Sequence, residues 1–200
     1  MQIPLEGAQV DYDSEEYSSH FRNKILILKT LDELLVQKSF EKISVSEICE
    51  CAHVSRSMFY VYFKNKAAVT QWYLRFAMDK GVNKVGINYS WFDGHLITTR
   101  TFADYRRACY SVLNSSHHSE DFGFFTEIRR AALHEAFEKK GIALTPKLDF
   151  QMEAVIAGEL VATNKWFNQL SIKELTAYLV SIVPQDLYNA LNNPINPKHV

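Results

Sequence analysis

From Phe21 onward, the hydrophobic residues of the chain recur at steps of three and four positions, which is the period of an amphipathic α-helix. Polar residues such as Lys24, Lys29 and Asp32 fall between them, and the stripe ends near Gln37. The alternation that is typical of strands is nearly absent, so the sequence predicts an all-α protein. The apolar stripe of this first helix consists of Ile25, Leu28, Leu31, Leu34 and Leu35.

Two short helices are predicted next, separated by a tight turn. Ser44 can cap the first turn of one helix, and Glu47 three residues later completes a capping box. Ser55 offers a new cap so soon afterwards that His53 must lie in the turn, where glycine is the usual residue. The next helix ends at about Phe63. Two short helices joined in this way and supported by a longer one form a helix-turn-helix.

Longer helices fill the rest of the chain. A fourth helix is predicted from Asn65 or Lys66 to Gly81, where the glycine is a plausible C-cap. Later stretches of helical period cover residues 102–112, 122–140, 146–167 and 171–183, and a last short helix reaches 191. We therefore expect a three-helix N-terminal module over residues 21–66, joined by the fourth helix to a helical C-terminal region over residues 67–200.

Composition adds few constraints. The chain has 200 residues, 47% of them hydrophobic, with only 7 Gly and 5 Pro, which is typical of a folded helical protein and argues against long disorder. No stretch approaches the length of a membrane-spanning helix, and the N-terminus lacks a basic region followed by an apolar run. We therefore expect a cytoplasmic protein without membrane contact.

The charge is unevenly distributed although the formal net charge is only −1. Residues 1–20 contain five acidic residues and no Lys or Arg, and without helical period they are interpreted as a mobile acidic tail. Residues 21–80 contain ten Lys and Arg against six Asp and Glu, and the remainder is balanced. The predicted helix-turn-helix is therefore in the basic part of the chain.

The segment 54–63, VSRSMFYVYF, has a polar, cationic start followed by interleaved aromatic residues. Phe59 and Phe63 are four residues apart and share one face, which we expect to be buried. Arg56 and Tyr60 share another face, which then points outward. An exposed Arg at a helix N-terminus can reach guanine edges in the major groove, while Tyr and Ser hydroxyls reach phosphates. The alternative is a surface helix whose tyrosines cover the edge of the core.

These residues also resemble a known family. The run ISVSEICECAHVSRSMFYVYFKNKAAV is similar to the DNA-binding module of TetR-type transcriptional repressors, and the resemblance covers about residues 21–75. The chain departs from the family pattern at Cys49, where Ala is usual, at His53 for Gly, and at Lys64 for Pro. The segment 163–183, TNKWFNQLSIKELTAYLVSIV, resembles the end of a branch that includes regulators of dihydroxyacetone utilisation.

The resemblance implies a homodimer that binds a palindromic double-stranded DNA operator and releases it when a small-molecule effector binds. The C-terminal region would then be the regulatory and dimerisation domain. Repression and activation both remain open, as does a second reading, in which the same fold acts as a co-regulator that binds another protein. The residues that the resemblance assigns to DNA contact are Ser44, Ser55, Arg56, Ser57, Tyr60, Tyr62 and Lys66.

For the effector site and the dimer interface the signal is weaker. Aromatic and polar residues that interrupt apolar stripes can line a ligand pocket, although aromatics at helical spacing are usually core. Dimerisation is expected to use helices around Leu148–Phe167 and Ile172–Leu191, where small residues such as Gly158 and Ala162 allow close approach. The candidate ligand-binding residues are Trp91, Phe92, His95, Tyr105, Tyr110, Phe124, His134 and Trp166.

Catalytic and metal signals are not found in the sequence. The spacing of Cys49 and Cys51 is not that of zinc or redox sites, and Cys109 has no partner at a matching distance. No nucleophile–base arrangement or glycine-rich phosphate loop is present. We therefore expect neither an enzyme nor a bound cofactor or metal.

Overall fold

The computed structural model describes residues 18–113 and 118–199, and these are almost entirely helical; the side chains of residues 112–122 are not described. Residues 1–17 of the predicted acidic tail lie outside the described part, and the first helix begins at Ser19, within the range assigned to the tail. The elements are α1 (Ser19–Leu34), η2 (Phe40–Lys42), α2 (Val45–Cys51), α3 (Arg56–Tyr62), α4 (Lys66–Lys80), η3 (Val82–Lys84), α5 (Trp91–Asp104), α6 (Arg106–Leu113), α7 (His118–Lys140), α8 (Pro146–Trp166), α9 (Ile172–Ser181) and α10 (Gln185–Leu191).

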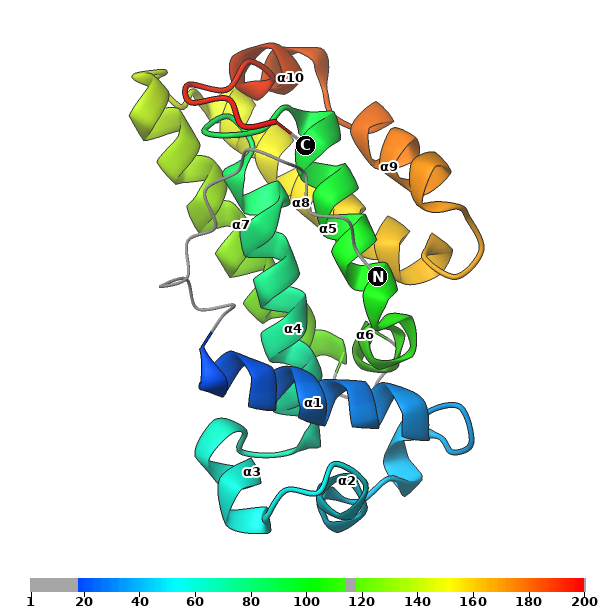
Figure 1. Ribbon diagram of the computed structural model, residues 1–200. Coiled ribbons are helices and arrows are strands. Elements are labelled where there is room, and N and C mark those ends of the chain that lie inside the picture. Colours follow the sequence, from blue (N-terminus) through cyan, green and yellow to red (C-terminus); the bar gives the residue numbers. More distant parts are fainter. Residues whose placement is uncertain (1–17, 114–117, 200) are drawn as a thin grey trace.

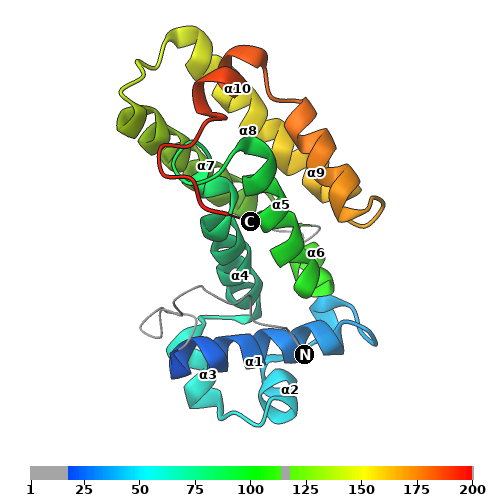
Figure 2. The same cartoon turned by 45° about the horizontal axis from the view of Figure 1, so that its top comes forward.

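The helices form two groups that share α4 (Figure 1). Helices α1, α2 and α3 lie together at one end, while α5 and α7–α10 pack around the far part of α4. The second view shows the same separation, with α4 running from the small group into the larger one (Figure 2). The predicted all-α architecture is confirmed, and α4 joins the helix-turn-helix to the C-terminal helices.

The small helical group has its own core. Phe59 is fully buried and Phe63 nearly so, which confirms that these side chains point inward. They meet Ile27, Leu28 and Leu31 of α1 in one continuous apolar cluster. At 25 cal/mol per Å², burial of each such side chain stabilises the fold by about 1.5–3 kcal/mol, so the orientation of α3 is set by its inner face.

Side-chain caps begin most of these helices, as the sequence predicted. The Ser55 hydroxyl accepts from the Met58 amide at 3.1 Å, and a complete capping box forms between Ser171 and Glu174. At α2 only the serine half of the predicted box is seen: Ser44 accepts from the Glu47 amide, while the Glu47 carboxylate pairs with Lys38. That ion pair ties α2 to the end of the α1 region.

The turn between α2 and α3 depends on His53. Its φ is 53°, in the left-handed region that glycine adopts most easily, so the histidine does occupy the position expected for glycine. The backbone there is closed by a hydrogen bond from the Val54 amide to the Cys49 carbonyl, at 3.0 Å. The local hydrogen bonding therefore compensates for a conformation that is uncommon for a residue with a side chain.

The prediction of one helix over residues 102–112 is wrong. The helix α5 begins earlier, at Trp91, and ends at Asp104, where Tyr105 leaves helical geometry with φ −130° and ψ 57°. A separate helix, α6, follows at Arg106. The apolar stripe continues across the break because both helices bury their residues against the same core. The start of α5 had a readable signal, since the Ser90 hydroxyl caps the Asp93 amide at 3.1 Å.

Two glycines allow α4 and α5 to approach with their backbones in contact. A Cβ on Gly81 would lie 2.3 Å from the Gly94 carbonyl oxygen and 2.3 Å from the Thr98 hydroxyl. A Cβ on Gly94 would lie 2.5 Å from a methyl group of Val85. The end of α4 and α5 therefore approach closely, and a Cβ on either glycine would meet the neighbouring segment.

We expect Gly81→Ala to lower the free energy of unfolding by about 1–3 kcal/mol, because the new methyl group must displace backbone atoms of α5. Gly123→Ala is the matched control: nothing lies within 4 Å of its Cβ, and the exposed helical site of α7 should gain up to about 1 kcal/mol. Urea unfolding of both variants provides the measurement. Equal stability of Gly81→Ala and the wild-type protein would contradict the close contact.

Candidate functional site

The outer face of α3 is polar at its start and lies at the end of the molecule remote from the C-terminal helices (Figure 1). Ser55, Arg56 and Ser57 are exposed, and Tyr60 is 50% exposed. Phe59, in contrast, is fully buried. The structure therefore places four of the seven predicted DNA-contact residues on one accessible surface at the N-terminal half of a helix.

Local contacts orient this surface. The Arg56 guanidinium donates to the Ser46 hydroxyl of α2 and lies over the Tyr60 ring, 6.0 Å from its centre. The Ser55 and Ser57 hydroxyls are 2.9 Å apart. Arg56 is thus held between the two helices of the helix-turn-helix, which reduces the conformational entropy that would be lost on contact with a base edge. Ser44 is exposed at the start of α2, where its hydroxyl serves as the N-cap.

Tyr62 is less available than Tyr60. It is half-buried against α1, its hydroxyl accepts from Asn23 Nδ2 at 3.0 Å, and the His20 ring meets it edge-on at 5.6 Å. These contacts give Tyr62 a role in docking α3 on α1. Its hydroxyl retains the capacity to donate a hydrogen bond.

Lys66 has a structural position that the sequence did not suggest. Its Nζ donates to three backbone carbonyls, at 2.6 Å from Phe40, 3.2 Å from Glu41 and 2.6 Å from Ile43. An ammonium has only three N–H groups, so all of them are used within the chain. Desolvation lowers the pKa of Lys66, with the nearby Glu41 carboxylate opposing that effect. The expected phosphate contact of Lys66 is therefore not supported by this geometry, and its ammonium instead joins the start of α4 to η2.

Sequence reasoning left two exposed apolar residues of α3 unassigned. Val61 is 72% exposed and Met58 is 39% exposed, although neighbouring apolar residues are buried. Val61 follows Tyr60 directly and therefore lies at the edge of the same outer face. Aliphatic side chains at such positions can contact thymine methyl groups. The exposure of Val61 could not be predicted from the sequence, because the exposure of an apolar residue depends on the packing of the whole domain.

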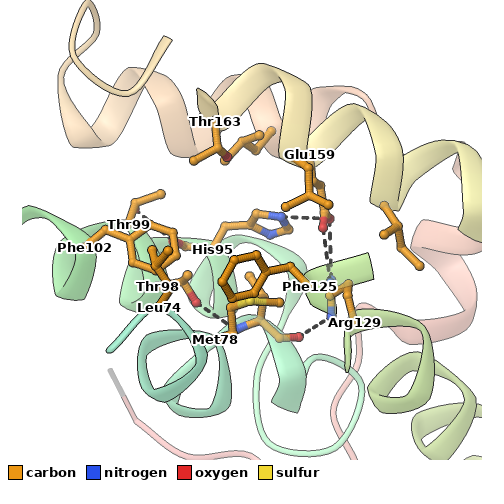
Figure 3. Close-up of a pocket in the computed structure, with 14 residues that line it drawn as sticks. Leu74, Met78, His95, Thr98, Thr99, Phe102, Phe125, Arg129, Glu159 and Thr163 are labelled. Carbon is orange, nitrogen blue, oxygen red and sulfur yellow. Dashed lines mark hydrogen bonds and ion pairs between the residues drawn. The ribbon is translucent and has the colours of Figure 1, made fainter. Parts of the chain in front are cut away.

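A second candidate site is a cavity of about 60 Å³ in the C-terminal half, between α4, α5, α7, α8 and α9 (Figure 3). Its walls are mainly apolar, with Leu74 and Met78 from α4, Phe102 from α5 and Phe125 from α7. The polar residues that line it are His95, Thr98, Thr99, Arg129, Glu159 and Thr163.

Three of these polar side chains form a buried charged cluster. Glu159 accepts from His95 Nε2 at 2.9 Å and from Arg129 Nε at 3.1 Å. His95 and Arg129 are each only 2% exposed, and the Arg129 guanidinium lies 5.4 Å from the centre of the Trp91 ring. Burial would raise the pKa of Glu159, but the Arg129 and His95 charges and hydrogen bonds outweigh it and lower the pKa to about 2. The carboxylate is therefore ionised at neutral pH.

Two residues of the cavity wall also hold the C-terminal end of α4. The Thr98 hydroxyl accepts from the Val82 amide at 2.9 Å and donates to the Ala77 carbonyl at 3.2 Å. Arg129 donates to the Val82 carbonyl, as the dashed lines in Figure 3 show. Any molecule that changes the position of Thr98 or Arg129 therefore acts on the end of the helix that leads to α3.

Of the predicted ligand-binding residues, only His95 lines this cavity. Trp91 is buried behind Arg129, and Tyr105 packs edge-on against Tyr73 at 5.0 Å. His134 is half-buried elsewhere on α7. The other four candidates do not line this cavity and have exposed side chains: Phe92, Tyr110, Phe124 and Trp166.

Arg129 and Glu159 were missed because no local pattern links them. They are 30 residues apart and lie on different helices, so only the packing of α7 against α8 brings them together. A signal was present, since each charged residue stands on a face of its helix that is otherwise apolar.

Within the described residues, no group of three or more His, Cys, Asp or Glu is arranged to hold a metal. The same part of the chain contains no helix long and apolar enough to cross a membrane.

We expect Lys66→Met to lower the free energy of unfolding by about 1–3 kcal/mol, because backbone carbonyls at the base of α4 lose their donor. Lys64→Met removes the same charge two residues away from an exposed position and should leave stability within about 0.5 kcal/mol of the wild-type value. Thermal and urea unfolding of both variants distinguish the cases. If the two variants are equally stable, Lys66 has no structural role.

Comparison with known proteins agrees with the helical arrangement. A family profile described as "Bacterial regulatory proteins, tetR family" matches residues 27–71. No curated protein sequence matches the chain. The solved structure "Dihydroxyacetone kinase operon activator DhaS" is similar, with a TM-score of 0.62 and 16% identity over 86% of this chain and 98% of that one.

Two further structures have the same fold. A TetR transcriptional regulator from Rhodococcus sp. RHA1 aligns with a TM-score of 0.52 and 16% identity, covering 84% of this chain and 98% of its own. A TetR-family transcriptional regulator from Syntrophomonas wolfei str. Goettingen aligns with a TM-score of 0.56 and 16% identity, covering 80% and 92%. Residues 27–71 therefore match the profile of the bacterial tetR family of regulatory proteins, and the chain has the all-helical fold of the solved TetR-family regulators.

Proposed function

We propose that this protein is a sequence-specific DNA-binding homodimer whose affinity for its operator is controlled by a small molecule in the C-terminal cavity. The observation that carries the proposal is the exposed polar face at the start of α3, in a domain of the tetR family. In this arrangement α3 enters the major groove, Arg56 reads base edges, and Ser55, Ser57 and Tyr60 reach phosphates. Ser44 and Tyr62 are secondary contacts from the start of α2 and the end of α3.

A dimer is proposed because one α3 reads too few base pairs for specific binding. The outer faces of α8 and α9 supply a suitable surface. Val161 and Tyr178 are each 57% exposed, Ile182 is 42% exposed and Trp166 is 39% exposed. Within one chain, Gly158 of α8 lets Ile182 pack closely, since a Cβ on Gly158 would lie 3.1 Å from Ile182 Cδ1. Two copies of this face would form a four-helix interface across a two-fold axis.

Control by a ligand is proposed from the position of the cavity. Leu74 and Met78 of α4 form part of its wall, and Thr98 and Arg129 bind the end of that helix. Suppose that α4 has two positions and that the ligand binds the protein more tightly in one of them. The ligand then shifts the equilibrium toward that conformation, which changes the separation of the two copies of α3. The role we propose is repression: the protein occupies its operator until the small molecule releases it. The similar structure named an activator supports activation as the second possibility.

A co-regulator that binds another protein is the alternative function. The near-zero net charge of the whole chain favours it mildly, since proteins that bind DNA without sequence preference are usually basic. The affinity for duplex DNA and its dependence on salt separate the two functions.

The test is selection of genomic fragments by the purified protein at two salt concentrations. We expect enrichment of a palindromic site, and Arg56→Ala and Tyr60→Ala to weaken its binding by about 1–3 kcal/mol, or roughly 5- to 150-fold. Arg100→Ala, which removes an exposed arginine on α5, is the matched control and should bind as the wild-type protein does. If no site is enriched, or if all variants bind equally, the assignment of α3 fails and the co-regulator function becomes the better one.

For the dimer, we expect sedimentation to give a molecular mass of two chains. Val161→Glu should shift the protein to monomers, because it places a charge in the centre of the proposed apolar interface. Val36→Glu is the matched control, since Val36 is 62% exposed just after α1, outside α8 and α9, and should leave the dimer intact. A wild-type monomer at micromolar concentration, or an unchanged dimer in Val161→Glu, would exclude this interface.

A further inference from the structure

The buried cluster beside the cavity has more hydrogen-bond donors than acceptors. Arg129 has five N–H groups, of which three are used: two by the Glu159 carboxylate and one by the Val82 carbonyl. Within the described residues, the second N–H of each terminal nitrogen has no protein acceptor. The guanidinium is 2% exposed, lies over the Trp91 ring and lines the cavity, so the cavity is the side from which a bound acceptor could approach these groups.

The cluster also has an excess of positive charge. The Nδ1 atom of His95 lies 2.7 Å from the Trp91 carbonyl oxygen, and Nε2 lies 2.9 Å from a carboxylate oxygen of Glu159. A carbonyl and an ionised carboxylate only accept hydrogen bonds, so both ring nitrogens are placed to donate, as in an imidazolium. His95 and Arg129 then provide two positive charges against the single negative charge of Glu159. All three groups are at least nine-tenths buried, where an unpaired charge is strongly unfavourable.

The cavity itself limits the size and character of what can balance that charge. Since about 10–15 Å³ of such volume holds one water molecule, 60 Å³ admits on the order of four to six non-hydrogen atoms. Beyond the charged cluster and three threonines, its wall is formed by aliphatic and aromatic side chains, including Leu74, Phe102 and Phe125. An inorganic phosphate would leave most of its oxygens against this apolar surface, whereas a short hydrocarbon chain fits it.

We propose that the effector is a small organic monoanion, a short-chain carboxylate, whose charged end binds Arg129 and whose hydrocarbon end lies against the apolar wall. This assignment rests on the proposed control of the protein by a ligand in the same cavity. The bound carboxylate gives the cluster two cations and two anions, so the buried charge is balanced. It also shares Arg129 with the Val82 carbonyl, which connects occupancy of the cavity to the end of α4.

The experiment compares acids with their neutral amides in the full-length protein at constant ionic strength. Acetate, propionate and butyrate are matched with acetamide, propionamide and butyramide, which have the same shape without the charge. We expect at least one acid to raise Tm by about 5–10 °C at 100-fold excess over its Kd, and the amides to have no effect. Octanoate, which exceeds the cavity, should not act. Equal shifts from acid and amide, or no shift up to about 50 mM acid, would overturn the proposal.

Two variants test the role of the cluster. Arg129→Gln should abolish the increase in Tm that the acid produces. Glu159→Gln removes the internal carboxylate that competes for Arg129, so the acid should raise Tm at least as much as in the wild-type protein. Loss of the shift in both variants would mean that the cluster only maintains the shape of the cavity, which contradicts the proposal. The comparison of acids and amides in the wild-type protein remains decisive if Arg129→Gln does not fold.

Operator binding is measured separately, with and without the acid that raises Tm. If the acid binds but no operator is found, the proposed function fails while the ligand class stands. If an operator is found and the acids do not bind, the ligand class fails and the DNA-binding function stands. If the acid changes operator affinity in the wild-type protein by more than about fivefold, both are supported.

Discussion

The hydrogen bonds that Thr98 and Arg129 make with the end of α4 hold the two halves of the molecule in one arrangement. Thr98 connects the Ala77 carbonyl to the Val82 amide, and Arg129 reaches the Val82 carbonyl from α7. Because α4 also begins at the base of the helix-turn-helix, these bonds contribute to the position of α3 relative to the C-terminal helices, together with the packing of α1 and α4 on α6. The Glu159 carboxylate in turn orients Arg129, so the charged cluster is part of the same mechanical connection.

At its other end α4 is attached just as firmly. Lys66, the first residue of the helix, donates to the carbonyls of Phe40, Glu41 and Ile43, and the Asn65 side chain caps the Ala68 amide at 2.9 Å. Tyr62 and Asn23 join α3 to α1 nearby. The helix-turn-helix and the first turn of α4 are therefore joined into one packed unit.

Local sequence patterns predicted most of the helices because each depends on a few neighbouring residues. Ser44, Ser55 and Ser171 cap the helices expected to begin there, and His53 takes the left-handed turn expected between α2 and α3. The exposed face of α3 followed in the same way from the four-residue spacing of Phe59 and Phe63, which are buried. Patterns of this length report on local hydrogen bonding and on one buried face, and these are what the structure contains.

The cavity could not be predicted in that way. It is formed where five helices meet, and the partners of Arg129 come from η3 and α8, at separations of 47 and 30 residues. Aromatic residues were poor guides, because those that interrupt apolar stripes here either belong to the core, as Trp91 does, or lie on the surface, as Phe124 does. The break at Tyr105 was missed for the same reason, since the apolar stripe continues across two helices that share a core.

The backbone contact between Gly81 and Gly94 gives α4 the geometry of a lever with its fulcrum at one end. The 15 residues of α4 span about 22 Å, so a tilt of about 5° at the glycines displaces the base of the helix-turn-helix by about 2 Å. Under the proposed control by a ligand, a small movement at the cavity end of α4 would therefore become a displacement of about 2 Å at the helix-turn-helix, a distance that matters on the scale of a DNA groove.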